Sequence, residues 1–147
     1  MRSGRDEHLR QTAVAAELRQ QLIALPDAAV RRDRAAGRVA VITGVFFVVA
    51  GLVKFVFHAW ELKAFRAFGL PWPDVSELFA GVLEVGGGVL LIARSLVVPV
   101  SALLAATMVV AIGASGVGHG DVIPSLTLAP VLLGSLVWLT ARSTNRR

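Results

Sequence analysis

The sequence contains no cysteine, and this absence removes several kinds of chemistry at once. Direct thiol–disulfide exchange, iron–sulfur clusters and cysteine-ligated zinc sites are all excluded for this chain. Charge is also scarce, because only 17% of the 147 residues are charged whereas 55% are hydrophobic. A soluble domain of this size carries about 25% charged residues. The composition therefore predicts a small helical membrane protein with a single domain.

The charge that is present is concentrated near the N-terminus. Residues 1–38 contain eight of the 15 basic residues and five of the 10 acidic residues. A net charge of +5 could suggest nucleic-acid binding. In a membrane protein, however, such an excess indicates orientation and contact with anionic lipid headgroups. We therefore expect the lipid bilayer as a partner, and no nucleic acid.

Four long apolar runs follow this basic segment. About 20 apolar residues cross a hydrocarbon core of ~30 Å, so each run is long enough for one transmembrane helix. The predicted fold class is all-α: a polytopic four-transmembrane-helix bundle with a cytoplasmic N-terminal helical extension. The expected parts are the extension at 1–38, helices at 39–57, 75–93, 96–113 and 122–141 within the domain 39–141, and a basic tail at 142–147.

Local signals predict further structure at the two ends of the bundle. Residues 9–25 should form a short amphipathic helix, and Asp27 should cap a second helix after it. Residues 58–74 should form a loop, with or without a helical extension at its start. Asp74 and Glu77 have the spacing of a capping box that opens the second transmembrane helix.

The glycines from Gly113 onward are expected to end the third transmembrane helix, because glycine favours helix termination.

Basic residues indicate how the helices are oriented. The 58–74 connection has only Lys63 and Arg66, and all other flanking cations lie on the opposite side. This asymmetry predicts a multi-pass protein of the cytoplasmic membrane whose N- and C-termini both face the cytoplasm. The opposite side is defined by Arg31, Arg32, Arg34, Arg38, Arg94, Arg142, Arg146 and Arg147.

The second apolar run carries two acids and two glycines on one helical face. Glu77, Gly81, Glu84 and Gly88 follow at steps of four, three and four, so we expect Gly81 and Gly88 to let another helix approach closely. Counting residues from the helix ends places Lys54 and Glu84 at similar depths in neighbouring helices. They could form a pair that fixes helix packing, or a site for a polar headgroup or a proton; both interpretations remain open.

Other polar residues are expected near the same end of the bundle. The candidate ligand-binding residues are Lys54, His58, Glu61, Glu84 and His119. Two histidines with acids could bind a metal or haem, but their spacing matches no specific ligand motif, and we predict no metal site. Trp60 and Trp72 are predicted to anchor the membrane–water interface.

Three ordered motifs resemble the DoxX-like family over about residues 39–141. They are Gly-x-x-Lys at 51–54, Phe-Gly-x-Pro at 68–71, and Gly-x-x-Glu-x-x-Gly-Gly at 81–88, followed by a tight turn with Arg94. The resemblance implies a four-helix integral membrane protein. It also implies that Lys54 and Glu84 are signature positions. The family's better understood members are subunits of quinone-linked sulfur-compound oxidation or membrane partners of soluble redox enzymes.

The resemblance leads to a functional hypothesis. We expect a subunit or membrane anchor of a quinone-linked redox system, with a small polar pocket in the outer half of the bundle. Its soluble redox partner would lie on the cytoplasmic side, and oligomers are compatible with this role. Any enzymatic contribution would be that of a non-catalytic accessory subunit. The alternative is a non-enzymatic scaffold that recruits a soluble partner through the N-terminal extension.

Overall fold

The computed structural model describes residues 2–118 and 125–145, and every regular element in these segments is a helix. This confirms the predicted all-α class. The elements are α1 (Arg2–Arg19), the π-helical η1 (Gln20–Ala24), α2 (Leu25–Arg32), α3 (Arg34–Val56), α4 (His58–Ala67), α5 (Pro73–Ile92), α6 (Val97–Val110), the π-helical η2 (Ala111–Val117) and α7 (Leu128–Thr144).

Three helical segments of the described chain are long and apolar enough to cross a membrane. They are α3 with 23 residues, α5 with 20, and the continuous segment Val97–Ser115 with 19. The fourth apolar helix, α7, has 17 described residues. At 1.5 Å per residue it is about 25 Å long, slightly less than a typical hydrocarbon core.

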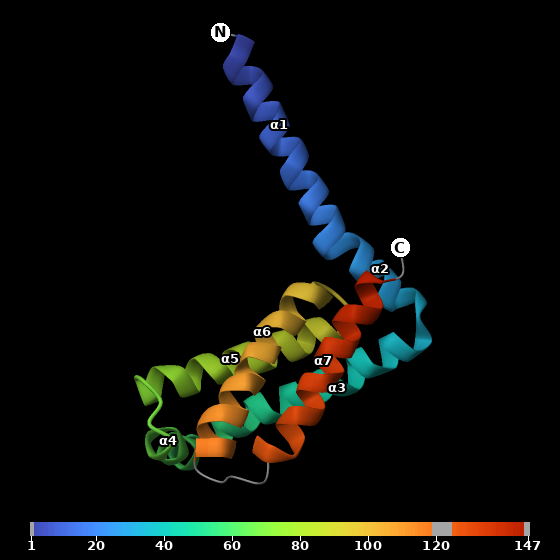
Figure 1. The fold of residues 1–147 in the computed structure, drawn as a ribbon. Helices are drawn as coiled ribbons and strands as arrows, with labels where there is room; N and C mark the ends of the chain where they lie inside the picture. The colour runs from blue at the N-terminus through green and yellow to red at the C-terminus, as the bar shows by residue number, and fades with distance from the viewer. Residues whose placement is uncertain (1, 119–124, 146–147) are drawn as a thin grey trace.

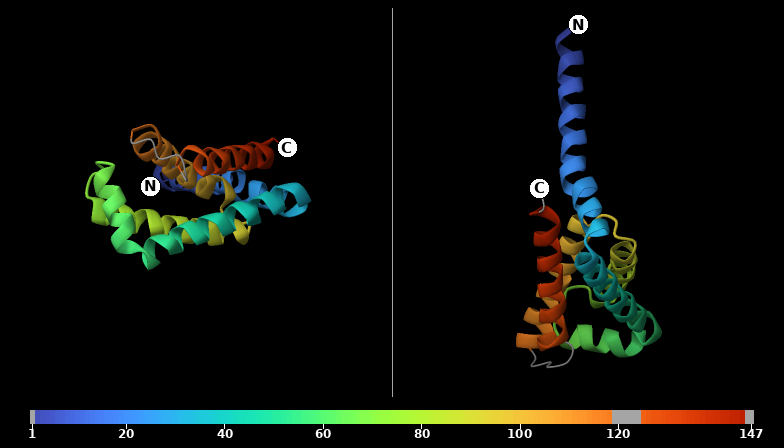
Figure 2. Two further views of the ribbon diagram at one scale, coloured as in Figure 1. Left: turned by 90° about the horizontal axis from the view of Figure 1, so that it is seen from below. Right: turned by 90° about the vertical axis from the view of Figure 1, so that its right-hand side faces the viewer.

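The helices pack as two neighbouring pairs, α3 with α5 and α6 with α7 (Figure 1). α2 lies at one end of the bundle, near the start of α3 and the end of α7, and we call this the basic end. α4 lies at the opposite end, which we call the α4 end (Figure 2). α1 projects away from the basic end, and among the described elements it packs mainly on η1 (Figure 1).

Large apolar side chains cover the outside of the bundle as well as filling its core, where Phe47, Leu104 and Leu136 are fully buried. Phe46, Phe79 and Val131 are 47%, 65% and 65% exposed. In the most apolar 18-residue stretch of each of the three long segments, only 28% is buried inside the protein. Lipid tails solvate apolar side chains as well as a protein core does, so this distribution is typical of a bundle within a bilayer.

Glycines set the distance between α3 and α5. A Cβ atom on Gly88 would lie 2.6 Å from the carbonyl oxygen of Gly44, and one on Gly51 would lie 2.8 Å from that of Gly81. Both distances are below van der Waals contact, so the two backbones touch where only glycine fits. The buried face of α5 consists of Glu77, Gly81, Glu84, Gly88 and Leu91.

The basic end is held together by Asp27, whose predicted role was wrong. Asp27 lies inside α2, not at its N-cap. Its carboxylate instead caps α6, accepting hydrogen bonds from the backbone N–H groups of Leu96 at 2.8 Å and Val97 at 2.9 Å. Arg94 and Leu96 both have φ of 53°, a conformation that costs non-glycine residues energy. The two bonds from Asp27 therefore stabilise a strained turn between α5 and α6.

A second aspartate ties the same end to the C-terminal helix. Asp33 is the N-cap of α3 and accepts a hydrogen bond from the backbone N–H of Ala35 at 3.0 Å. It also accepts one from Nε of Arg142 at the end of α7, at 2.8 Å. Because of this cap, α3 begins at Arg34, whereas the apolar pattern placed the first transmembrane helix at 39–57. Residues 25–38 are thus packed against the bundle.

The predicted capping box at the start of α5 is also wrong. α5 begins at Pro73 without a side-chain cap, and its N-cap residue Trp72 has φ of 45°. Asp74 pairs with Arg66 at 3.2 Å, and Glu77 turns inward. The ring of Pro73 disfavours right-handed helical geometry at Trp72. The helix therefore begins at Pro73 with Trp72 as its N-cap residue, and the N-cap position does not fall on Asp74. The 58–74 connection contains the separate helix α4, which follows Phe57.

The third transmembrane helix does not end at Gly113. It continues as η2 through Val117, so the prediction that glycine would break the helix there was wrong. In hydrocarbon an unbonded backbone N–H or C=O is costly, and a wider helical turn keeps these groups bonded where glycine would otherwise end the helix. The predicted fourth helix at 122–141 begins partly outside the described residues, and α7 extends to Thr144.

The glycine contact can be tested by adding a single methyl group. We expect Gly88→Ala to lower the free energy of unfolding by about 1–3 kcal/mol, because α3 and α5 must move apart. The matched control is Gly86→Ala on the same helix, where a Cβ meets nothing within 4 Å. Unfolding in mixed detergent micelles measures both. Equal stability of the two variants would contradict the contact.

Candidate functional site

Lys54 and Glu84 meet between α3 and α5 near the α4 end. Lys54 lies in the last turn of α3, where its charge is favourable at the helix C-terminus. Its Nζ atom is 2.8 Å from Oε2 of Glu84, and the two side chains are 15% and 6% exposed. The ion pair expected from depth counting is therefore present. Close packing of the glycines is what allows these two side chains to reach each other.

The approach of the lysine does not satisfy Glu84 completely. Nζ lies 2.8 Å from Oε2, and a carboxylate can accept hydrogen bonds at both of its oxygens. Glu84 thus keeps the capacity to accept a hydrogen bond from a further group.

A second pair, between a histidine and an acid, lies close in the sequence to the Lys54–Glu84 pair. Nδ1 of His58, the first residue of α4, lies 2.9 Å from Oε2 of Glu77, a distance at which an Nδ1–H donates to the carboxylate. His58 is 56% exposed, whereas Glu77 is 1% exposed. The other carboxylate oxygen of Glu77, Oε1, has no hydrogen-bond partner among the described residues. This pair connects the surface at the α4 end with a fully buried carboxylate.

Glu61 joins the two pairs electrostatically. Burial raises the pKa of the Glu61 carboxyl, the positive charge of Lys54 partly offsets this, and the negative charge of Glu77 raises it further. Lys54, His58, Glu61, Glu77 and Glu84 together form what we call the charged cluster. Its three acids outnumber its one permanent cation, so the cluster favours an additional proton or a hydrogen-bond donor.

The other predicted site residues lie elsewhere or cannot be placed. His119 lies outside the described residues. Trp60 and Trp72 are 65% and 79% exposed, as interface residues would be. Within the described segments, no group of three or more histidine and acidic residues could hold a metal ion.

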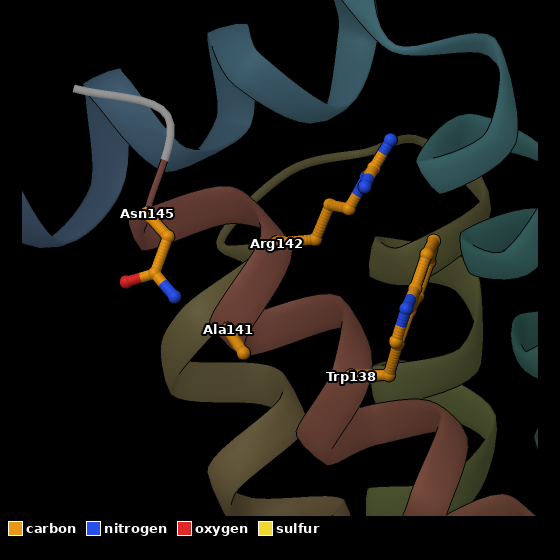
Figure 3. Close-up of a pocket in the computed structure, with 4 residues that line it drawn as sticks. All are labelled: Trp138, Ala141, Arg142 and Asn145. Carbon is orange, nitrogen blue, oxygen red and sulfur yellow. The ribbon is translucent and has the colours of Figure 1, made fainter.

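Two hollows in the described structure are lined mainly by residues of α6 and α7, and not by members of this cluster. One is on α7 at the basic end and is lined by Trp138, Ala141, Arg142 and Asn145 (Figure 3). The other lies between α6 and α7. Neither is lined by Lys54 or Glu84. No sequence motif marked Trp138 or Asn145, although the i, i+4 spacing of Trp138 and Arg142 places these two residues on one helical face.

Two sequence signals assigned different roles to Glu77. The spacing from Asp74 predicted a capping box, whereas the four-three-four spacing placed Glu77 with Glu84 on one face of the helix, and this is the buried face of α5. That spacing was the better signal. The charged cluster can therefore exchange a proton through His58 and hold a small polar group between buried carboxylates and a lysine.

The pairing of Lys54 with Glu84 can be tested by a double-mutant cycle. We expect Lys54→Met alone to cost about 3 kcal/mol of unfolding free energy, because it leaves a buried carboxylate without its cation. Adding Glu84→Gln should recover most of that loss. The control cycle uses the exposed pair Arg66 and Asp74, whose coupling should be roughly 0–1 kcal/mol. Additive losses for Lys54 and Glu84 would show that the two do not interact.

Comparison with known proteins agrees with this architecture. The family model described as DoxX matches residues 35–119, which is more than half of the chain. No curated protein and no solved structure matches it. The matched segment contains α3, α4, α5 and α6, and therefore both members of the Lys54–Glu84 pair. The chain is a small multi-pass membrane protein that belongs to the DoxX family.

Proposed function

We propose that this protein is a membrane-embedded accessory subunit or anchor of a quinone-linked redox system, with the charged cluster as its small-molecule site. The observation that carries the proposal is a pair of buried carboxylates, Glu77 and Glu84, of which Glu77 has an oxygen, Oε1, with no hydrogen-bond partner among the described residues. They lie beside Lys54 and His58, which can donate hydrogen bonds. Buried ionisable groups in a membrane bundle are costly to keep, which favours a functional role.

The donor and acceptor atoms of the cluster fit a quinone-like headgroup. Such a headgroup offers carbonyl acceptors when oxidised and hydroxyl donors when reduced. Lys54 and His58 would donate to the carbonyl oxygens, whereas Glu77 and Glu84 would accept from the hydroxyl groups. His58, which is 56% exposed, would exchange protons with water. We propose that the electron donor is a separate soluble redox protein.

Orientation follows from the distribution of arginine. We propose that the basic end faces the cytoplasm and that the α4 end faces the other side of the cytoplasmic membrane. The proposed quinone site would then lie in the outer half of the bundle. The projecting α1 would lie on the cytoplasmic side, where it could contact the soluble redox partner.

The quinone site can be tested with purified protein in nanodiscs. We expect Lys54→Met to weaken binding of a short-tailed benzoquinone about tenfold or more, because a charged hydrogen-bond donor is lost. Lys63→Met, which removes an exposed lysine on α4, is the matched control and should leave binding unchanged. The double variant Lys54→Met/Glu84→Gln should be stable but remain defective in binding. Wild-type affinity in that double variant would refute the site.

A second candidate is a non-enzymatic scaffold, and the direction of α1 favours it. α1 leaves the bundle as a separate helix, and Val14 and Leu18 on it are 57% and 53% exposed. Only the part before α2 projects in this way. Residues 25–38 hold the basic end through Asp27 and Asp33, so they belong to the bundle in any such scaffold.

This distinction determines how the scaffold should be tested. Deleting residues 2–24 should release a co-purifying soluble partner while the thermal stability of the bundle in detergent stays unchanged. Deleting residues 2–38 should also destabilise the bundle, because the cap on α6 and the ion pair to Arg142 are lost. A partner that remains bound after the shorter deletion would argue against α1 as the docking element.

A further inference from the structure

Two hollows meet at the basic end of α7. The first has a volume of about 310 Å³ and is bounded by Trp138, Ala141, Arg142 and Asn145 (Figure 3). The second has a volume of about 360 Å³ and runs between α6 and α7. Ala141 lines both, so the hollows adjoin at a residue whose side chain is one methyl group.

The first hollow has the chemistry of a phosphate site. Arg142 and Trp138 extend side by side from successive turns of α7, with the guanidinium 5.5 Å from the ring centroid (Figure 3). Arg142 uses only Nε in its bond to Asp33, so its terminal N–H groups have no hydrogen bond to the described residues. A guanidinium binds phosphate through such paired N–H groups.

The surroundings also favour an anion. The segments 25–38, 93–97 and 138–145 meet at this end and contain six arginines against two aspartates, Asp27 and Asp33. Both aspartates are already engaged, one by the start of α6 and the other by α3 and Arg142. The remaining field at the basic end is positive, and it attracts acidic headgroups.

The second hollow has the chemistry of an acyl-chain groove. Its walls are made mainly of small or apolar side chains. They include Ala102 and Ala105 of α6 and Val137 and Leu136 of α7. α6 and α7 are apolar helices, so a groove between them on the bundle surface lies at the level of the hydrocarbon. The two hollows together thus present a cationic end and an apolar length, the shape of an amphiphile.

We propose that this surface binds one anionic phospholipid, with its phosphate on Arg142 beside Trp138 and one acyl chain passing Ala141 into the groove between α6 and α7. A lipid, in contrast to free phosphate, uses both hollows at once. The site is at the opposite end of the bundle from the charged cluster, and it does not depend on the quinone proposal. Bound there, the lipid stabilises the junction of α2, α3 and α7 that Arg142 and Asp33 make.

The fluorescence of Trp138 tests this directly. In a Trp60→Phe/Trp72→Phe background, Trp138 is the sole tryptophan. The protein is reconstituted in phosphatidylcholine vesicles that contain a minor fraction of chain-brominated phosphatidylglycerol, or the same fraction of chain-brominated phosphatidylcholine. Bromine quenches tryptophan only at contact. We expect the acidic lipid to be enriched about fivefold at Trp138 relative to the bulk bilayer.

Variants separate the headgroup from the chain. Arg142→Gln should abolish the preference for the acidic lipid. Ala141→Leu, which leaves the Arg142–Asp33 pair intact, should reduce it by obstructing the passage between the hollows. Arg66→Gln removes an exposed arginine at the α4 end and should preserve the preference. Equal quenching by both lipids in the parent protein would overturn the proposal, as would full preference in both Arg142→Gln and Ala141→Leu.

Discussion

Backbone contact between α3 and α5 is the constraint on which the rest of the structure depends. Gly44 and Gly88 bring the two helices together where any Cβ would collide with a carbonyl oxygen. In a bilayer there is little hydrophobic drive to pair helices, so close van der Waals contact of this kind supplies much of the stability. The same contact sets the register of the two helices. At that register Lys54 and Glu84 are 2.8 Å apart.

The two ends of the bundle use charge in different ways. At the basic end, Asp27 and Asp33 satisfy backbone N–H groups and an arginine, so buried acids there are structural. At the α4 end, Glu77 keeps a buried oxygen without a hydrogen-bond partner among the described residues, and Glu84 has the Lys54 ammonium on one of its two oxygens. A fully bonded carboxylate stabilises a fold, whereas a partly bonded one has capacity left for a proton or a ligand. That contrast is why the proposed small-molecule site lies at the α4 end.

Much of the architecture could be predicted because its signals are local. Apolar runs identified the spanning helices, and the four-three-four spacing of Glu77, Gly81, Glu84 and Gly88 identified the buried face of α5. Depth counting paired Lys54 with Glu84, since helices joined by a short connection usually pack as antiparallel neighbours. Local signals failed where a distant segment competed. Asp27 resembled a cap for its own helix, but it caps α6 instead. Leu96, one of the two residues whose N–H groups it accepts from, lies 69 positions further along the chain.

The sequence by itself determined that this is an all-helical membrane protein, because hydropathy and helical periodicity depend only on neighbouring residues. It also determined which acid and which base could meet within the bilayer. Only the tertiary structure decided that residues 25–38 belong to the bundle and that Glu77 pairs with His58. Only it showed that Trp138 and Arg142 border a hollow. These outcomes depend on contacts between segments far apart in the chain, and no local pattern specifies such contacts.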